Sequence, residues 1–111
     1  MNGEVKKIKF LKFAKADYKE IQSYVVKKFS VLDWNNINDE WKLKIEALVE
    51  NPSSGSKIRE LEGTGFVDFR KIHHKNVYMI YSWDEKNIYV RMFVPSMRDF
   101  RTHLLKRILD Q

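Results

Sequence analysis

The chain has 111 residues, the length of one domain, with a net charge of +6, 43% apolar residues and no cysteine. This composition excludes a disordered chain, disulfides, thiolate metal sites and a cysteine nucleophile. The basic excess favours acidic partners such as nucleic acid or an acidic protein segment. No apolar run reaches the roughly 18 residues of a membrane span, and the N-terminus lacks a signal-peptide core, so we expect a cytoplasmic protein without a membrane partner.

The N-terminal part of the chain predicts a strand and a helix. Loose alternation of apolar and basic side chains predicts a strand over residues 5–13. Apolar residues then recur every three or four positions, which predicts a helix over 14–29. Asp17 and Glu20 have the spacing of a capping box, or place acid in the first turn of that helix.

A second amphipathic helix is predicted over residues 34–51. Asp33 is its predicted cap, and the helix ends before Pro52 because the residue that precedes a proline avoids the helical conformation. The loop 52–57 is too short for a linker between domains. One face of the helix carries its apolar residues, which are Trp34, Ile37, Trp41, Ile45 and Leu48.

The second half of the chain predicts a sheet followed by a helix. Segments 66–72, 77–83 and 88–94 are rich in β-branched and aromatic residues, and four polar residues separate each from the next. Connections of this length predict an antiparallel meander. Residues 98–109 predict a final helix with a basic outer face. The predicted order is β-α-α-β-β-β-α, a single α+β domain whose helical hairpin packs on a small antiparallel sheet.

His73 and His74 are the one pair of residues that looks like a ready-made catalytic or metal site. They fall in the predicted connection between two antiparallel strands, where neighbouring side chains point to opposite faces and do not converge on one metal. A structural role at a hairpin tip is therefore the favoured interpretation. Catalysis by one of the two stays open because histidine is a general base at neutral pH. We expect no metal and no cofactor.

The strand aromatics offer a second kind of site. Phe69, Tyr78, Tyr81, Tyr89 and Phe93 suit stacking on nucleic-acid bases, although the core is the more common place for such side chains. Tyr78, Ile80 and Arg91 alternate with core positions, so we expect some of the three on an uncovered face of the sheet. The chain has no P-loop, dinucleotide fingerprint, nucleophile elbow or zinc-protease motif.

The order of four segments resembles the toxins of the RelE/ParE superfamily of type II toxin–antitoxin systems. The resemblance covers nearly the whole chain. It implies a fold of the kind predicted above and a toxin that a cognate antitoxin neutralises in a hetero-oligomeric complex. The segments are AKADYKEI (14–21), KIEALVENPSSGS (44–56), FRKIHHKNVYMIY (69–81) and IYVRMFVPSMRD (88–99).

Within that superfamily, the chain is more similar to the ParE branch. The run from Arg70 through the hairpin to Tyr81 resembles that branch, and so does the segment 91–104. The resemblance implies a toxin that poisons DNA gyrase by protein–protein contact. Arginine is suited to such contacts because its fork binds carboxylate or phosphate at two points. The expected target-binding residues are Arg70, Arg91, Arg98, Arg101, Lys106 and Arg107.

The alternative is the RelE branch, whose members cleave messenger RNA on the ribosome. Such a reaction needs cations around the phosphate and an acceptor for the 2′-hydroxyl proton. Here the candidate catalytic residues are Arg70, His73, His74 and Arg98. The sequence departs from that branch at Tyr78 and Leu104, which stand where it often has functional residues, and from both branches at Val94–Pro95, where many members have a histidine. A third hypothesis is an interaction module without toxicity.

The antitoxin is expected to wrap a disordered segment around the helical hairpin and the sheet. An acidic stretch in it would complement the net charge of +6. Trp34, Trp41 or the last helix is either its docking surface or part of the core, and we favour the core for Trp41. Arg98 and Asp99 match the family's arginine–acid pair, and Asp99 is also placed to pair with an arginine of the last helix.

Overall fold

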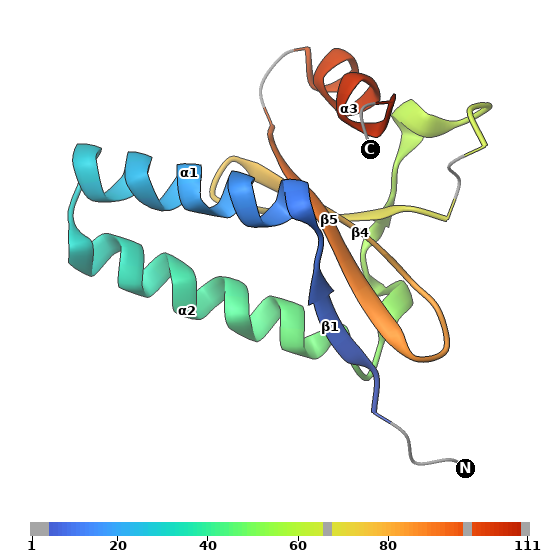
Figure 1. The fold of residues 1–111 in the computed structure, drawn as a ribbon, viewed down its shortest axis with the longest axis horizontal. Helices are drawn as coiled ribbons and strands as arrows, with labels where there is room; N and C mark the ends of the chain where they lie inside the picture. Colours follow the sequence, from blue (N-terminus) through green and yellow to red (C-terminus); the bar gives the residue numbers. More distant parts are fainter. Residues whose placement is uncertain (1–4, 66–67, 97–98, 110–111) are drawn as a thin grey trace.

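The computed structural model describes residues 5–65, 68–96 and 99–109. It confirms the α+β class and the predicted order of elements (Figure 1). No helix in the described ranges is both long and apolar enough to cross a membrane. The elements are β1 (Lys7–Phe10), α1 (Lys12–Lys28), α2 (Val31–Ala47), the short 3-10 helices η1 (Pro52–Ser54) and η2 (Arg59–Leu61), β2 (Ser56–Lys57), β3 (Arg70–His74), β4 (Val77–Trp83), β5 (Asn87–Pro95) and α3 (Phe100–Leu109).

The predicted meander of β3, β4 and β5 forms the centre of a five-stranded sheet with the order β1-β5-β4-β3-β2. β1 adds to it in parallel, pairing Lys7–Phe10 with Asn87–Val90 of β5. β2 is a two-residue antiparallel partner of β3. Because the chain leaves the sheet after β1 to begin α1, no strand among the described residues lies on the outer side of the second half of β5.

The capping box predicted at Asp17 and Glu20 is wrong. α1 begins at Lys12, two residues before the predicted start, and its first turn contains no acidic residue. Asp17 therefore lies inside the helix, where it is buried. It belongs to the inward stripe that also contains Ala14 and Val25. A carboxylate in that position needs a partner in the protein interior.

The predicted cap of the second helix, Asp33, is also wrong, because the cap lies three residues earlier. α2 begins at Val31, and Ser30 is its cap. The Ser30 hydroxyl accepts the Asp33 backbone N–H at 2.9 Å and donates to the Asp33 carboxylate at 2.9 Å. Asp33 is the third residue of the helix, where its negative charge interacts favourably with the positive end of the helix dipole.

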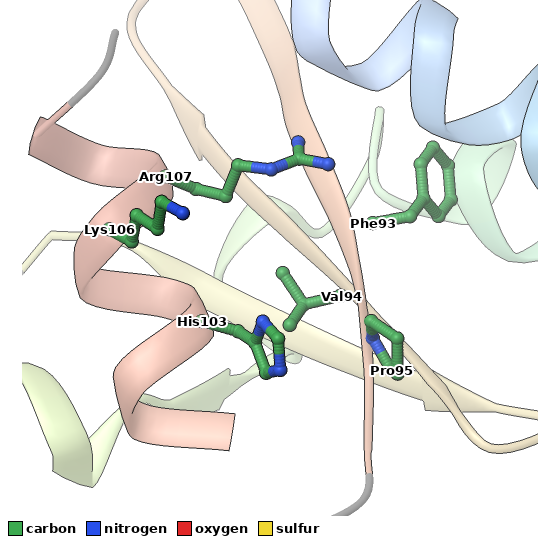
Figure 2. A pocket seen from close by; sticks show the side chains of 6 residues that line it. All are labelled: Phe93, Val94, Pro95, His103, Lys106 and Arg107. Carbon is green, nitrogen blue, oxygen red and sulfur yellow. The ribbon is translucent and has the colours of Figure 1, made fainter. Parts of the chain in front are cut away.

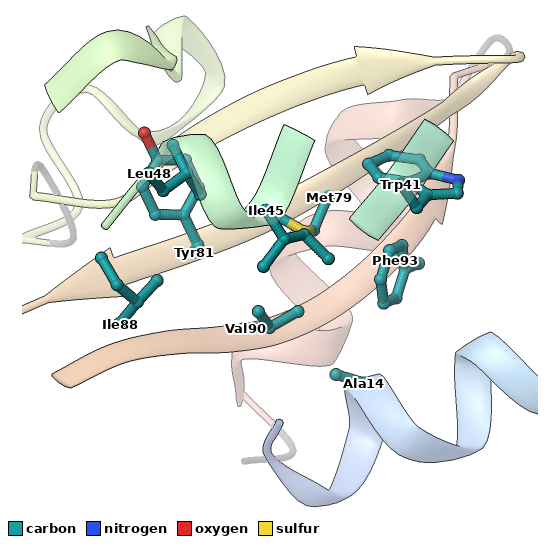
Figure 3. Close-up of a cluster of buried hydrophobic side chains, with 9 residues drawn as sticks. All are labelled: Ala14, Trp41, Ile45, Leu48, Met79, Tyr81, Ile88, Val90 and Phe93. Carbon is teal, nitrogen blue, oxygen red and sulfur yellow. The ribbon is translucent and has the colours of Figure 1, made fainter. Parts of the chain in front are cut away.

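The helical hairpin and α3 cover opposite faces of the sheet. α1 and α2 enclose the larger core cluster, in which Trp41, Met79 and Phe93 meet (Figure 3). Trp41 is 1% exposed, and Trp34 is 6% exposed. Both tryptophans are therefore core residues, as was favoured for Trp41. They present little surface to a partner.

The face of the sheet that was expected to be uncovered is covered by α3. Ile80 is fully buried in the second core cluster, and Tyr78 packs against that cluster. The rings of Tyr78 and Phe100 lie 4.7 Å apart between centroids. The expectation was wrong because the inner face of the last helix, formed by Phe100, Leu104 and Ile108, needs an apolar surface to pack on.

Candidate functional site

The basic side chains of the last helix differ in their exposure. Arg101, His103 and Lys106 are exposed. Leu104, three residues after Arg101, is fully buried. His103 donates its backbone N–H to the Asp99 carbonyl at 3.1 Å, so the first turn of α3 starts from Asp99, which has a positive φ of 68°. The exposed cations of α3 are thus held on a helix that the core fixes in place.

Arg107, another cation of α3, does not share that exposure. Its Nη1 donates to Asp17 Oδ2 at 2.8 Å, and its Nη2 donates to Asp17 Oδ1. The Asp17 side chain is 6% exposed, and that of Arg107 is 33% exposed. The Arg107 guanidinium also lies 5.1 Å from the Phe13 ring centre. This two-point contact ties α3 to α1 across the edge of the sheet.

The same carboxylate closes the open edge of β5. Phe93 donates its backbone N–H to Asp17 Oδ2 at 3.0 Å. Two residues further along, Pro95 has no N–H to offer. The outer edge of β5 beyond β1 is therefore poorly suited to pairing with another strand, because its donors are occupied or missing.

A pocket of about 170 Å³ lies between β5 and α3 (Figure 2). On the β5 side, Val94 points toward the helix, and on the α3 side the ring of His103 faces the strand. Three of its six residues have basic side chains, and all three come from α3. The pocket is lined by Phe93, Val94, Pro95, His103, Lys106 and Arg107.

Arg70 is engaged inside the protein at the far end of the sheet. Its Nη1 donates to the carbonyls of Ser53 at 3.1 Å and Gly55 at 3.0 Å. Tyr81 holds the same loop, since its hydroxyl donates to the Pro52 carbonyl at 2.6 Å and accepts the Gly55 N–H at 2.9 Å. Burial raises the pKa of Tyr81 above its usual value. Arg70, the first residue of β3, and Tyr81, in the middle of β4, thus hold the segment that follows α2.

Arg91 is likewise half-buried. Its Nε donates to the Ser82 hydroxyl at 2.8 Å, and its guanidinium lies 4.5 Å from the centre of the Phe69 ring. Burial lowers the pKa of this guanidinium. Of the five predicted target-binding residues that the structure describes, Arg101 and Lys106 are exposed, whereas Arg70, Arg91 and Arg107 are partly buried in internal contacts. Arg98 lies outside the described residues.

The two histidines contact different layers of the protein. His73 Nε2 lies 3.1 Å from the Ser96 hydroxyl, and its ring lies 4.7 Å from that of Tyr78, on the α3 side. His74 Nε2 lies 2.8 Å from Glu40 Oε1, on the α2 side. The connection itself is shorter than predicted. Both histidines belong to β3, and the turn consists of Lys75 and Asn76, both with positive φ, as in the two-residue turns typical of hairpins.

The set of residues named for an RNA-cleavage site is therefore spread out. His73 and His74 lie on opposite faces, and Arg70 is three residues from His73, which is about 10 Å along a strand. Within the described ranges, no group of three or more histidine, cysteine, aspartate or glutamate side chains is arranged to hold a metal ion.

Two residues important for this architecture escaped the sequence analysis. Asp17 was interpreted as a helix cap, although its position on the inward stripe, shared with Ala14 and Ile21, was a signal of burial. Tyr81 was considered for stacking on bases, and nothing in the sequence indicated that its hydroxyl binds the loop after α2. Both side chains have their partners 26 or more residues away.

Comparison with known proteins gives a consistent result. The family described as the ParE toxin of the type II toxin–antitoxin system, parDE, matches residues 8–100. A solved structure entitled "Chromosomal ParDE TA system from P. aeruginosa" has a similar fold, with a TM-score of 0.66 and 12% identity over 84% of this chain and 98% of that chain. No curated protein matches in sequence.

Proposed function

The chain belongs to the ParE toxin family of type II toxin–antitoxin systems, and from this premise we propose that it inhibits growth by poisoning DNA gyrase. The family match over residues 8–100 carries the proposal. In this proposal the toxin contacts gyrase and traps it with cleaved DNA. It needs no catalytic group of its own.

The outer face of α3 is the contact surface that we assign to the target. Arg101 is exposed in the first turn of α3, and Lys106 is exposed beside His103 at the pocket between α3 and β5. Exposed cations on a rigid helix suit acidic side chains or phosphates of an enzyme–DNA complex. Arg70, Arg91 and Arg107 have a supporting role in this proposal, because their guanidinium groups already bind the protein's own groups.

A cognate antitoxin is the proposed partner in the cell. The net charge of +6 favours an acidic segment in it. Because Trp34 and Trp41 are buried, such a segment would bind the outer surfaces of the helices and not the tryptophans.

A supercoiling assay with purified toxin, DNA gyrase, ATP and relaxed plasmid tests the proposal. We expect loss of supercoiling together with accumulation of cleaved plasmid. Addition of the antitoxin should restore supercoiling. Unimpaired gyrase at micromolar toxin would refute the proposal.

RNA cleavage on the ribosome is the second candidate, and one observation favours it. Lys71 Nζ lies 4.5 Å from the centre of the Tyr78 ring, and His73 packs against the same ring, so a cation and a titratable ring share the α3 side of the sheet. Incubation with ribosomes and messenger RNA, followed by mapping of cleaved ends, tests this candidate. Absence of toxin-dependent ends would exclude it.

A further inference from the structure

The exposed surface of β1 and α1 is rich in lysine. Between Lys7 and Lys28 every lysine is exposed, whereas Glu20 is the one exposed acidic residue. The other acid in this stretch, Asp17, is buried and paired with Arg107. This surface therefore has a strong positive charge. Its exposed lysines are Lys7, Lys9, Lys12, Lys15, Lys19, Lys27 and Lys28.

The centre of this surface is a straight stripe on α1. Lys12, Lys15 and Lys19 follow a spacing of three and four residues, which places them on one side of the helix. The buried residues Ala14 and Val25 occupy the opposite side. From Lys12 to Lys19 the stripe rises about 10 Å. Among the described residues, none forms a salt bridge with these three lysines.

We propose that this stripe binds the phosphodiester backbone of nucleic acid. A strand of duplex DNA carries one charge per roughly 3.4 Å of axis, so the stripe faces about three phosphates. Lysine suits such contacts because it is a mobile point charge that adapts to irregular phosphate positions. Binding of this kind is independent of base sequence.

The lack of large exposed apolar side chains beside the stripe distinguishes the proposed ligand from a protein. The exposed side chains beside the stripe are small, such as Ala16 and Ser23. Protein interfaces depend on buried aromatic or apolar residues at their centre and are depleted in lysine. The first large exposed apolar side chain along α1 is Tyr24, which lies beyond the stripe.

This inference adds a second surface to the molecule, separate from the α3 face that we assign to the enzyme target. It does not depend on gyrase as the target. A toxin that holds nucleic acid through α1 would concentrate on DNA or RNA before it meets its target, because nonspecific phosphate binding speeds association.

Fluorescence anisotropy with a labelled duplex of random sequence, across a series of NaCl concentrations, tests the proposal. The test variant is Lys12→Gln/Lys15→Gln/Lys19→Gln. The control is Lys42→Gln/Lys57→Gln/Lys86→Gln, which removes the same charge from exposed sites elsewhere. Glutamine has a helix propensity close to that of lysine, so both variants should fold, and melting temperatures check this.

We expect the test variant to lower the salt-dependence slope of log Kd by about 2 to 3 and to weaken binding more than about tenfold. The control should lose much less. Equal losses in both variants would overturn the proposal, because net charge alone would then explain binding, and so would the absence of wild-type binding. Single-stranded RNA as a second probe identifies which nucleic acid binds more tightly. Polyglutamate as a third probe would overturn the proposal if it bound as tightly and lost affinity in the same variant.

Discussion

Asp17 and Arg107, which are 90 residues apart in the sequence, form a two-point ion pair that joins the first helix to the last. Asp17 also accepts the backbone N–H of Phe93, so one carboxylate connects α1, β5 and α3. Buried charges persist in proteins when they are paired and hydrogen-bonded, and Asp17 has both kinds of partner. The position of α3, and with it the proposed target surface, depends on this contact.

Replacement of Asp17 should therefore destabilise the fold. Asp17→Ala leaves the Phe93 N–H and the partly buried Arg107 without their acceptor. Since the Arg107 side chain is 33% exposed and regains some hydration, we expect a loss of about 2–3 kcal/mol in the free energy of unfolding. Urea denaturation measures it. Glu20→Ala, an exposed acid on the same helix, is the control and should change stability by less than about 0.5 kcal/mol. Equal effects would contradict the structure.

The clamp on the loop after α2 predicts a second effect on stability. Tyr81→Phe removes the hydroxyl that binds Pro52 and Gly55 and should cost about 1–3 kcal/mol. Gly55→Ala should also destabilise, because a Cβ there would lie 2.5 Å from the Tyr81 hydroxyl. In the double variant Tyr81→Phe/Gly55→Ala the two losses should be less than additive, since the hydroxyl, the nearest of the three atoms that the new Cβ would crowd, is gone. Strict additivity in thermal unfolding would show that the two residues do not interact.

The stability of the protein should fall at high pH through Tyr18. Burial raises the pKa of Tyr18 from 10.0 to about 12, and its hydroxyl donates to Asn38 Oδ1 at 2.6 Å. The folded state therefore favours the neutral phenol. Its stabilising effect is complete below the unfolded pKa of 10.0 and is lost as the pH rises toward 12. The difference in unfolding free energy between wild type and Tyr18→Phe should shrink over this interval. A difference independent of pH would disprove the assignment.

The histidines provide a test between the two toxin mechanisms. If gyrase is the target, His73→Ala and His74→Ala should retain growth arrest, because neither ring belongs to the α3 surface. His74→Ala should still lower stability. The centre of the His74 ring lies 5.3 Å from that of Trp41, and its Nε2 lies 2.8 Å from Glu40 Oε1. Induction of each variant in cells, with melting temperatures as a fold control, measures both effects. Loss of toxicity from His73→Ala at unchanged stability would favour RNA cleavage.

Local patterns in the sequence predicted most of the fold. The β-branched segments around Ile72, Ile80 and Val90 and the short connections between them identified the meander. The parallel pairing of β1 with β5 could not be predicted in this way, because the register of Lys7 with Asn87 depends on how the whole chain packs. The cap at Ser30 was missed because Asp33 is also a strong cap residue.

The functional surface was less predictable than the fold. Arginines read from the sequence as one basic group differ in the structure, where Arg107 binds Asp17 and Arg101 is exposed. Their roles depend on partners that are distant in the sequence, and the composition does not indicate which residues become partners. The stripe on α1 was missed for a related reason. Acidic residues elsewhere in the first half of the chain nearly cancel its charge when the net charge of that half is counted.

The most direct test of the proposed target surface is a gyrase cleavage assay on matched variants. Arg101→Gln/Lys106→Gln removes the exposed cations of α3, and Lys42→Gln/Lys57→Gln removes equal charge elsewhere. We predict that the α3 variant yields about tenfold less cleaved plasmid or worse, equivalent to about 1.4 kcal/mol of lost binding free energy, while the control matches wild type. Equal cleavage by wild type and the α3 variant, at equal melting temperature, would contradict the account.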